Sequence, residues 1–297
     1  MICEDPRAYL LGLEGIALMR AFTGEFDRDF VEARIAEVRR VLADEALAGA
    51  AVEVDRVDTV TGYRLWSATY DRPNSAFDLD EPVVREIVGA LPVGVALDAA
   101  CGTGRHAELL AGRGHRVIGV DSSPDMLARA RERVPQGGFL LGDLHRLPVA
   151  DASVDLIVCA LALTHVPALG PVLTEFARVL RPGGHLVTAD VHPDRVAQGG
   201  VPPVRGDDGR PGRLSAHRHL VGDYLRAALP VGLHVRRCEE PPLPAVGRPD
   251  AENAAQPWEA GPWELWPWAL ARLVPDAARA AAAGPALLVW HFRKGGS

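Results

Sequence analysis

Apolar residues recur every three to four positions through residues 6–45. This spacing is typical of amphipathic helices, and the sequence TGEF at 23–26 separates two of them. One apolar stripe in the second helix holds Phe30, Ile35, Val38, Val41 and Leu42. We interpret residues 1–50 as an N-terminal helical extension that packs on the main domain or pairs with a second copy in a homodimer. A direct contact with substrate is the alternative.

From about residue 82 onward, short apolar runs alternate with stretches of helical spacing. This alternation is typical of an α/β fold, in which helices cover both faces of a largely parallel sheet. The predicted strands are 94–99, 116–121, 138–142, 154–160 and 184–190, and the predicted helices are 105–113, 123–133 and 170–180. The last of these helices presents one apolar face, formed by Val172, Leu173, Phe176, Val179 and Leu180. The sequence RPGG at 181–184 ends it, because proline cannot continue a helix.

The rest of the chain predicts a helix followed by a strand within 219–240, and a final strand at 286–294. Residues 51–297 are therefore expected to form one α/β domain. Two stretches rich in glycine and proline, at about 193–218 and 241–284, are expected to be insertions in it. Such loops commonly shape variable substrate sites.

Four of the six tryptophans lie in the second of these insertions. Trp263 and Trp266 are candidates for a lid over a planar or apolar substrate. The alternative is ordinary packing of a short helix against the sheet or a partner subunit.

Composition narrows the classes of partner. The net charge is −7 and no basic stripe is visible, which argues against nucleic acid as a partner. The four cysteines lie far apart, so neither a disulfide framework nor a zinc site is indicated. No basic leader and no run of 18 apolar residues occurs. We therefore expect a small-molecule substrate, no membrane partner and a cytoplasmic location.

The sequence LDAACGTGRHA at 97–107 places a glycine turn between a predicted strand and helix. Gly102, Gly104 and Ala107 fit the G-x-G-x-x-G/A pattern of a dinucleotide-binding turn. Asp98 conflicts with that assignment, because a carboxylate at the strand end would repel a pyrophosphate. S-Adenosylmethionine carries an ammonium group and no phosphate, so it removes the conflict. A nicotinamide-dependent oxidoreductase remains the rival, to be separated by whether NADH or S-adenosylhomocysteine stabilises the protein.

Two further acids follow in the same register. Asp121 ends the second predicted strand, where a carboxylate can accept hydrogen bonds from ribose hydroxyls. Asp143 follows the third strand, where it can accept from an exocyclic adenine amine. Three carboxylates at the carboxyl ends of three strands form one row, and this edge is where open α/β sheets bind ligands.

Four motifs in this order resemble those of the class I S-adenosylmethionine-dependent methyltransferases, over about residues 60–195. They read VALDAACGTGR, GVDSSPDML, GDLHRLPVADASVDLIVCA and EFARVLRPGGHLVTAD. The segment GYRLWSATYD at 62–71 resembles the aromatic helix of the family's ubiquinone-biosynthesis-like, small-molecule branch. The resemblance implies a Rossmann-like seven-strand mixed sheet whose last strand is antiparallel.

The resemblance also implies S-adenosylmethionine as the cofactor. The residues it assigns to cofactor binding are Tyr63, Trp66, Tyr70, Asp98, Ala100, Gly102, Gly104, Arg105, Asp121, Ser122, Met126, Asp143, Leu144, Ala160 and His165. Ala100 departs from the family pattern, which has a glycine there. Alanine is acceptable at this position if its φ is negative.

Methyl transfer needs alignment of the acceptor, and a base only when the acceptor must lose a proton. His165, after the fourth strand, and His192, after the fifth, are the candidate bases. His217 and His219 are candidate substrate contacts, with a plain surface position as the alternative. Apart from the close pair His217 and His219, the histidines lack metal-ligand spacing, so no metal is expected.

The sequence therefore predicts methyl transfer to a small acceptor, to oxygen in preference to nitrogen or carbon, with a role in natural-product metabolism. The segment CALALTHV after the fourth strand lacks the Asn-Pro-Pro-Tyr-like turn of amino-group methyltransferases. An S-adenosylmethionine-binding protein with a non-methylating activity, either a cyclase or a regulator, is the alternative.

Overall fold

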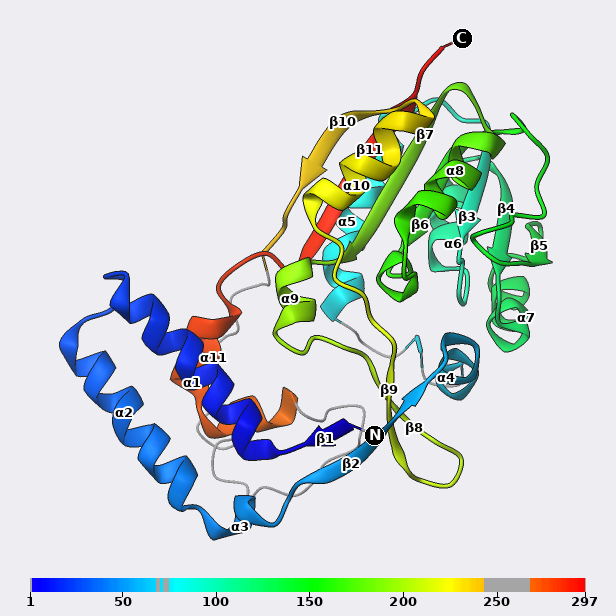
Figure 1. Cartoon of the computed structure of the whole chain (residues 1–297). Coiled ribbons are helices and arrows are strands. Elements are labelled where there is room, and N and C mark those ends of the chain that lie inside the picture. Colours follow the sequence, from blue (N-terminus) through cyan, green and yellow to red (C-terminus); the bar gives the residue numbers. More distant parts are fainter. Residues whose placement is uncertain (1, 68–69, 72–74, 243–267, 297) are drawn as a thin grey trace. The chain divides into compact units, whose positions relative to one another are not determined.

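The computed structural model describes residues 2–67, 70–71, 75–242 and 268–296. The chain divides into two compact units. The first unit combines Met1–Val57, Pro202–Leu214 and Pro242–Gly284, and the second combines Asp58–Val201, Ser215–Pro241 and Pro285–Ser297. Each unit has its own sheet, and the elements of both are labelled in Figure 1.

The second unit is built on a seven-strand sheet in the order β10-β11-β7-β6-β3-β4-β5. Its strands are β3 (Val95–Ala99), β4 (Arg116–Asp121), β5 (Gly138–Leu141), β6 (Val154–Ala160), β7 (Leu180–Val191), β10 (Leu233–Glu239) and β11 (Leu287–Lys294). The five strands from β3 to β7 pair in parallel, whereas β11 runs antiparallel to both β7 and β10. The predicted mixed sheet with an antiparallel last strand is confirmed.

Helices lie on both faces of this sheet, with α8 and α10 in front and α5 behind in the view of Figure 1. The helices are α4 (Thr59–Trp66), α5 (Ser75–Gly89), α6 (Arg105–Gly112), α7 (Pro124–Arg133), α8 (Leu169–Val179), α9 (Pro193–Ala197) and α10 (Val221–Ala228). Two 3₁₀ turns, η1 (Leu163–His165) and η2 (Leu229–Val231), complete the unit. Local signals start α7, since Ser123 caps it by accepting the N–H of Met126 and Pro124 follows in the first turn.

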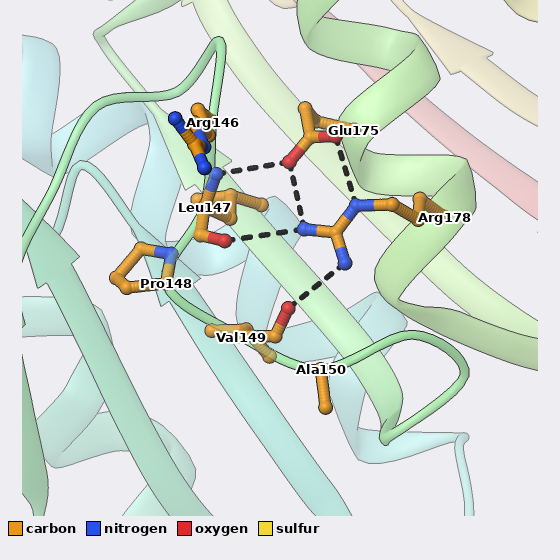
Figure 2. Close-up of a pocket in the computed structure, with 7 residues that line it drawn as sticks. All are labelled: Arg146, Leu147, Pro148, Val149, Ala150, Glu175 and Arg178. Atoms are coloured by element: carbon orange, nitrogen blue, oxygen red, sulfur yellow. Dashed lines mark hydrogen bonds and ion pairs between the residues drawn. The ribbon is translucent and has the colours of Figure 1, made fainter.

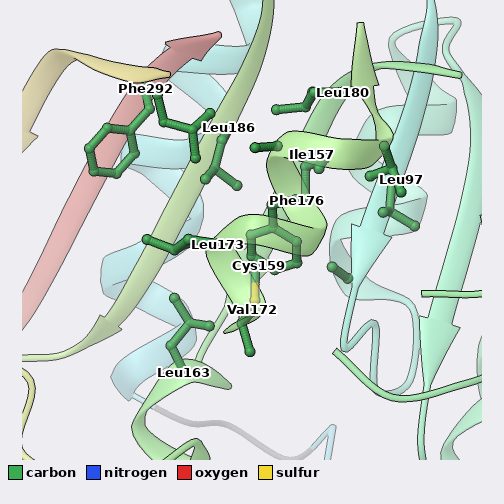
Figure 3. Packing of buried hydrophobic residues seen from close by; sticks show 14 of the residues in the cluster. Leu97, Ile157, Cys159, Leu163, Val172, Leu173, Phe176, Leu180, Leu186 and Phe292 are labelled. Atoms are coloured by element: carbon green, nitrogen blue, oxygen red, sulfur yellow. The ribbon is translucent and has the colours of Figure 1, made fainter. Parts of the chain in front are cut away.

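The main core of this unit lies between the sheet and α8. Figure 3 shows Phe176 of α8 among side chains of β3, β6 and β7, with Leu97 and Ile157 nearby. The whole apolar face predicted for this helix is buried. Each such side chain contributes about 1.5–3 kcal/mol by leaving water, so this face fixes α8 against the sheet.

The first unit contains a helical layer and a small sheet. Its elements are β1 (Ile2–Glu4), α1 (Pro6–Phe22), α2 (Arg28–Ala43), α3 (Glu45–Ala48), β2 (Val52–Val57), β8 (Pro203–Arg205), β9 (Pro211–Leu214), η4 (Trp268–Leu273) and α11 (Pro275–Ala282). The four strands pair in the order β1-β2-β9-β8, and β2 runs parallel to β9. The predicted pair of N-terminal helices is confirmed, but residues 203–205 and 211–214 form strands where the sequence predicts only loop.

The apolar stripe expected on α2 is partly wrong. Val41 is buried, but Ile35 is 40% exposed and Leu42 is 57% exposed. The buried face instead includes Arg34, whose guanidinium pairs with the buried Glu14 of α1 at 3.1 Å. Because the buried face contains a charged residue, the spacing of apolar residues alone could not locate this face. A homodimer through these helices stays a prediction.

Candidate functional site

A hollow of about 200 Å³ opens where β3, β4, β5 and β6 end. Its lining comes entirely from the second unit. The residues are Thr59, Tyr63, Tyr70, Ala100, Gly102, Val120, Asp121, Ser122, Gly142, Asp143, Leu144, His145, Ala160, Leu161, Ala162, His165 and Val166. Ten of the residues that the sequence assigns to cofactor binding are among them, and they come together from segments far apart in the chain.

The glycine turn lies at the floor of this hollow. Gly102 and Gly104 have φ values of +52° and +83°, and Ala100 also has a positive φ of +57°. The expectation of a negative φ at Ala100 is therefore wrong. A left-handed alanine is strained, since its Cβ approaches the following carbonyl. Gly104 does not line the hollow; a Cβ there would lie 3.1 Å from Ala130, so this glycine allows α6 to approach α7.

Asp121 is anchored by the turn that it faces. One of its carboxylate oxygens accepts the N–H of Gly102 and the other accepts the N–H of Ser123, each at 2.8 Å. Burial raises its pKa, and these backbone donors partly offset that rise. Since a carboxylate has about four acceptor sites, each oxygen retains capacity for one further donor, such as a ribose hydroxyl.

Asp98 lies at the end of β3 and is 2% exposed. Its Oδ2 atom has no hydrogen-bond partner. Burial raises the pKa of this carboxyl to about 6, although His106, the N–H of Ala107 and Arg105 act in the opposite direction. A buried carboxylate with an unused oxygen is costly, and a cation bound beside it would remove that cost.

Asp143 has a partner that the sequence did not indicate. Its Oδ1 accepts the backbone N–H of His145 at 2.7 Å and contacts the Nδ1 atom of the same residue at 2.6 Å. The Asp143 side chain is 65% exposed. Both side chains line the hollow, so His145 joins Asp143 on the side where adenine was expected.

A second hollow, of about 600 Å³, lies beside residues 146–150 and α8. Figure 2 shows Glu175 and Arg178 of α8 turned toward the backbone of this segment. Glu175 accepts the N–H of Leu147, and Arg178 donates to the carbonyls of Leu147 and Val149. These polar groups are hydrogen-bonded to one another. We therefore interpret the cluster as structural support for the segment that follows Asp143.

His165 is the one predicted base that lines the hollow. Its Nδ1 lies 2.7 Å from the carbonyl oxygen of Ser215, and its Nε2 lies 2.9 Å from the Tyr63 hydroxyl. A carbonyl can only accept, so Nδ1 carries the proton and Nε2 accepts from Tyr63. Burial lowers the pKa of His165, which favours this neutral form.

The structure does not bring His192 to the hollow. His192 caps α9, where its Nδ1 accepts the N–H of Asp194 at 3.2 Å. Its Nε2 lies 3.3 Å from a carboxylate oxygen of Glu240. The side chain is buried and is not among the residues that line the hollow. Its position after the fifth strand predicted the right edge of the sheet, but its local capping role turns it elsewhere.

His217 and His219 hold the loop that carries His165. The N–H of His217 donates to the carbonyl of Thr164 at 2.7 Å. The Nε2 atom of His219 contacts the carbonyl oxygens of Leu163 and Val166, at 3.1 and 2.8 Å. These contacts are with backbone, so the structure gives the pair a role in loop position.

Helix α4 and the segment after it bring Tyr63, Trp66 and Tyr70 together. Ring centroids lie 5.6 Å apart for Tyr63 and Trp66, and 5.9 Å apart for Tyr63 and Tyr70. Tyr63 and Tyr70 line the hollow and Trp66 packs behind them. The tyrosines therefore cover the side of the hollow that faces the glycine turn and His165.

Two other residues assigned to the cofactor, Arg105 and Met126, do not line the hollow. Arg105 forms a two-point ion pair with the fully buried Asp80, at 2.8 and 2.6 Å. Met126 is fully buried in α7. Trp263 and Trp266 lie outside the described residues.

Sequence reasoning missed Asp190, at the end of β7. This carboxylate is 2% exposed and accepts the N–H of Thr164 at 3.0 Å and that of Val191 at 2.8 Å. Burial raises its pKa to about 6. Asp190 thus ties the His165 loop to the sheet. Its position at a strand end, as for the other three acids, was a signal that could have found it.

Comparisons with known proteins agree with this geometry. Residues 97–188 match the family described as "Methyltransferase domain". A malonyl-[acyl-carrier protein] O-methyltransferase from Yersinia pestis is 43% identical over 90 residues, which are 30% of this chain and 34% of that protein. An S-adenosylmethionine-dependent methyltransferase structure from Mesorhizobium loti has a TM-score of 0.50 at 24% identity, and the match covers 72% of this chain and 97% of that one.

This chain carries a class I S-adenosylmethionine-dependent methyltransferase domain. The methyltransferase domain also has the fold of a [4+2]-cyclase, SpnF, with a TM-score of 0.53 at 18% identity, over 83% of this chain and all of that one. The chain spans about half or less of the length of the curated relatives it matches. The structural matches establish the fold of this domain.

None of the described helices is long and apolar enough to cross a membrane. In the same part of the chain, no three histidine, cysteine, aspartate or glutamate side chains gather as metal ligands would.

Proposed function

We propose that this chain transfers a methyl group from S-adenosylmethionine to an oxygen atom of a small-molecule acceptor. One observation carries the proposal. A neutral histidine, His165, lines the same hollow as Asp121 and Asp143 of the acidic row, while Asp98 lies buried at the end of β3, two residues before Ala100 in the lining. The acceptor in the name of the Yersinia pestis relative is also an oxygen acceptor, which supports this class without naming the compound.

The residues present fit the cofactor. The unused Oδ2 of Asp98 suits a buried ammonium group, and Asp121 keeps acceptor capacity for ribose hydroxyls. Asp143 and His145 stand where adenine would bind, and Tyr63 and Tyr70 would cover the ligand. The three acids lie at or just after the carboxyl ends of β3, β4 and β5, in that order.

When bound, S-adenosylmethionine supplies an activated methyl group, whose bond to sulfur breaks as the bond to the acceptor oxygen forms. The chain itself then has two tasks. It holds the acceptor in line, which excludes water and lowers the entropic barrier. It also takes a proton from the acceptor, and the Nε2 atom of His165 is the unprotonated base on the hollow.

Calorimetric titration with S-adenosylhomocysteine tests the cofactor site. We expect Asp98→Asn to weaken binding by about 30-fold or more, since removing one partner of a buried charge pair costs about 2–5 kcal/mol. Asp29→Asn, an exposed acid on α2, is the matched control and should bind as the wild type does. An affinity unchanged in Asp98→Asn, or thermal stabilisation by NADH alone, would contradict the proposal.

The reaction is tested by incubating the chain with methyl-labelled S-adenosylmethionine and a panel of small alcohols, phenols, carboxylic acids and amines. Transfer to an oxygen acceptor supports the proposal. Tight binding of S-adenosylhomocysteine without transfer to any compound would instead favour a non-methylating, cyclase-like or regulatory activity.

A further inference from the structure

The Tyr63 hydroxyl blocks direct access to His165. It occupies the Nε2 atom at 2.9 Å, and the Nδ1 atom is occupied by the Ser215 carbonyl. The two rings meet edge to face with centroids 5.5 Å apart. Both side chains line the hollow. A hydroxyl group that enters the hollow therefore meets a base whose accepting atom already holds a hydrogen bond from the protein.

This inference rests on the proposed function. We propose that Tyr63 and His165 act as one proton acceptor, in which the acceptor's hydroxyl contacts the Tyr63 oxygen and never His165 itself. The O–H bond of the acceptor breaks as a new O–H bond forms on Tyr63. The original Tyr63 proton moves to Nε2 of His165, which becomes an imidazolium. No oxidant or further reactant is required.

The surroundings define the resting state of the pair. Burial raises the pKa of Tyr63 well above its ordinary value, so the resting hydroxyl keeps its proton and donates a hydrogen bond to Nε2 of His165. Tyr70, Asp190 and Asp121 act on Tyr63 in the same direction. Burial lowers the pKa of His165, and His217 acts in the same direction, which favours the neutral imidazole at rest.

The His165 end of the pair is fixed by backbone. Ser215, whose carbonyl accepts from Nδ1, directly follows β9, and the N–H of His217 bonds the carbonyl of Thr164. Asp190 anchors the N–H of Thr164 from the sheet. The imidazole is thereby held in the tautomer that can only accept at Nε2, which a relay through Tyr63 requires.

The test uses 4-nitrophenol, a single-ring hydroxyl probe whose absorption reports ionisation. We expect the full chain, with and without S-adenosylhomocysteine, to bind it and shift its apparent pKa downward. Tyr63→Phe keeps the ring and should reduce that shift at least fivefold. A wild-type chain that does not bind or ionise the probe, or a Tyr63→Phe variant that ionises it equally, would overturn the relay.

A second measurement reports the Tyr63–His165 hydrogen bond directly, so that it does not depend on probe binding. Diethyl pyrocarbonate acylates unprotonated imidazole, and peptide mapping reports the rate at His165 alone. We expect Tyr63→Phe to raise that rate several-fold because Nε2 loses its hydrogen bond, whereas Asp29→Asn, at an exposed position of α2, should leave it unchanged. Equal rates in wild type and Tyr63→Phe would contradict the pairing. If the wild-type chain does not bind S-adenosylhomocysteine, that result contradicts the proposed function itself.

Discussion

A buried carboxylate of the first unit, Glu14, has an arginine partner, whereas a buried carboxylate of the second unit, Asp98, has none in the described part of the chain. In the first unit, Glu14 is fully buried and pairs with Arg34 at 3.1 Å. In the second, Asp98 is almost as buried, and no ion pair reaches it from the described residues. From this difference we infer that Glu14 has a partner within the fold, whereas Asp98 is the buried carboxylate that can take a cationic ligand.

Backbone strain follows the same division. Among the described residues, the non-glycine positions with positive φ are Ala100, Ala152 and Leu161, all in the second unit. Ala100 and Leu161 line the hollow. In the described part of the first unit, positive φ is confined to glycines. Strain gathered at one hollow is typical of a functional site, where the surrounding structure over-determines the backbone.

The largest expected effect breaks the pair in the first unit. Arg34→Met leaves Glu14 buried without its cation, which raises the pKa of this carboxyl further and should cost about 3–5 kcal/mol at pH 8. Hydrogen exchange of the α1 and α2 amides measures the loss, with β3 and β6 as the internal reference. The double variant Arg34→Met and Glu14→Leu should recover most of it. If the α1 and α2 amides of Arg34→Met exchange as slowly as in the wild type, the ion pair does not stabilise the first unit, and the contrast with Asp98 fails.

A smaller effect is the pH dependence of the same helices. Burial raises the pKa of Glu14 to about 7, from 4.5 in an unfolded chain. The folded state therefore binds more protons than the unfolded state between these values, and stability falls as pH rises from about 4.5 to 7. Glu14→Gln should flatten this dependence in the exchange of α1 and α2. A profile that stays as steep in the variant would assign the titration to another group.

The smallest effect concerns the strained turn. Ala100→Gly removes the strain of a left-handed alanine, which is about 1–2 kcal/mol. The greater conformational freedom of glycine in the unfolded chain lowers the free energy of unfolding by about 0.5–1 kcal/mol. We expect urea unfolding to show a gain of about 0.5–1 kcal/mol. Gly102→Ala is the opposite change at a similar φ and should destabilise. A loss of stability in Ala100→Gly would mean that the alanine methyl group makes contacts that outweigh the strain.

The elements of the parallel sheet could be read from the sequence because their signals are local. Buried runs such as VDLIVCA, and stops such as RPGG, lie within a few residues of the boundaries they predict, and β6 matches its predicted range. The four-strand sheet of the first unit could not be read in this way. Its central parallel pair joins Asp55 to Gly212, and its edge strands have only three residues each. Short strands paired across such a distance carry no periodic signal.

In the candidate site too, some features have a local sequence signal and others depend on distant segments. Asp98, Asp121 and Asp143 follow successive strands, so the sequence alone determined a row of acids at one sheet edge. Only the tertiary structure decided that His165 meets Tyr63 while His192 turns to Glu240. The physical reason is that strand ends are fixed by the sheet, whereas the direction of a loop histidine depends on backbone carbonyls and hydroxyls that distant segments deliver.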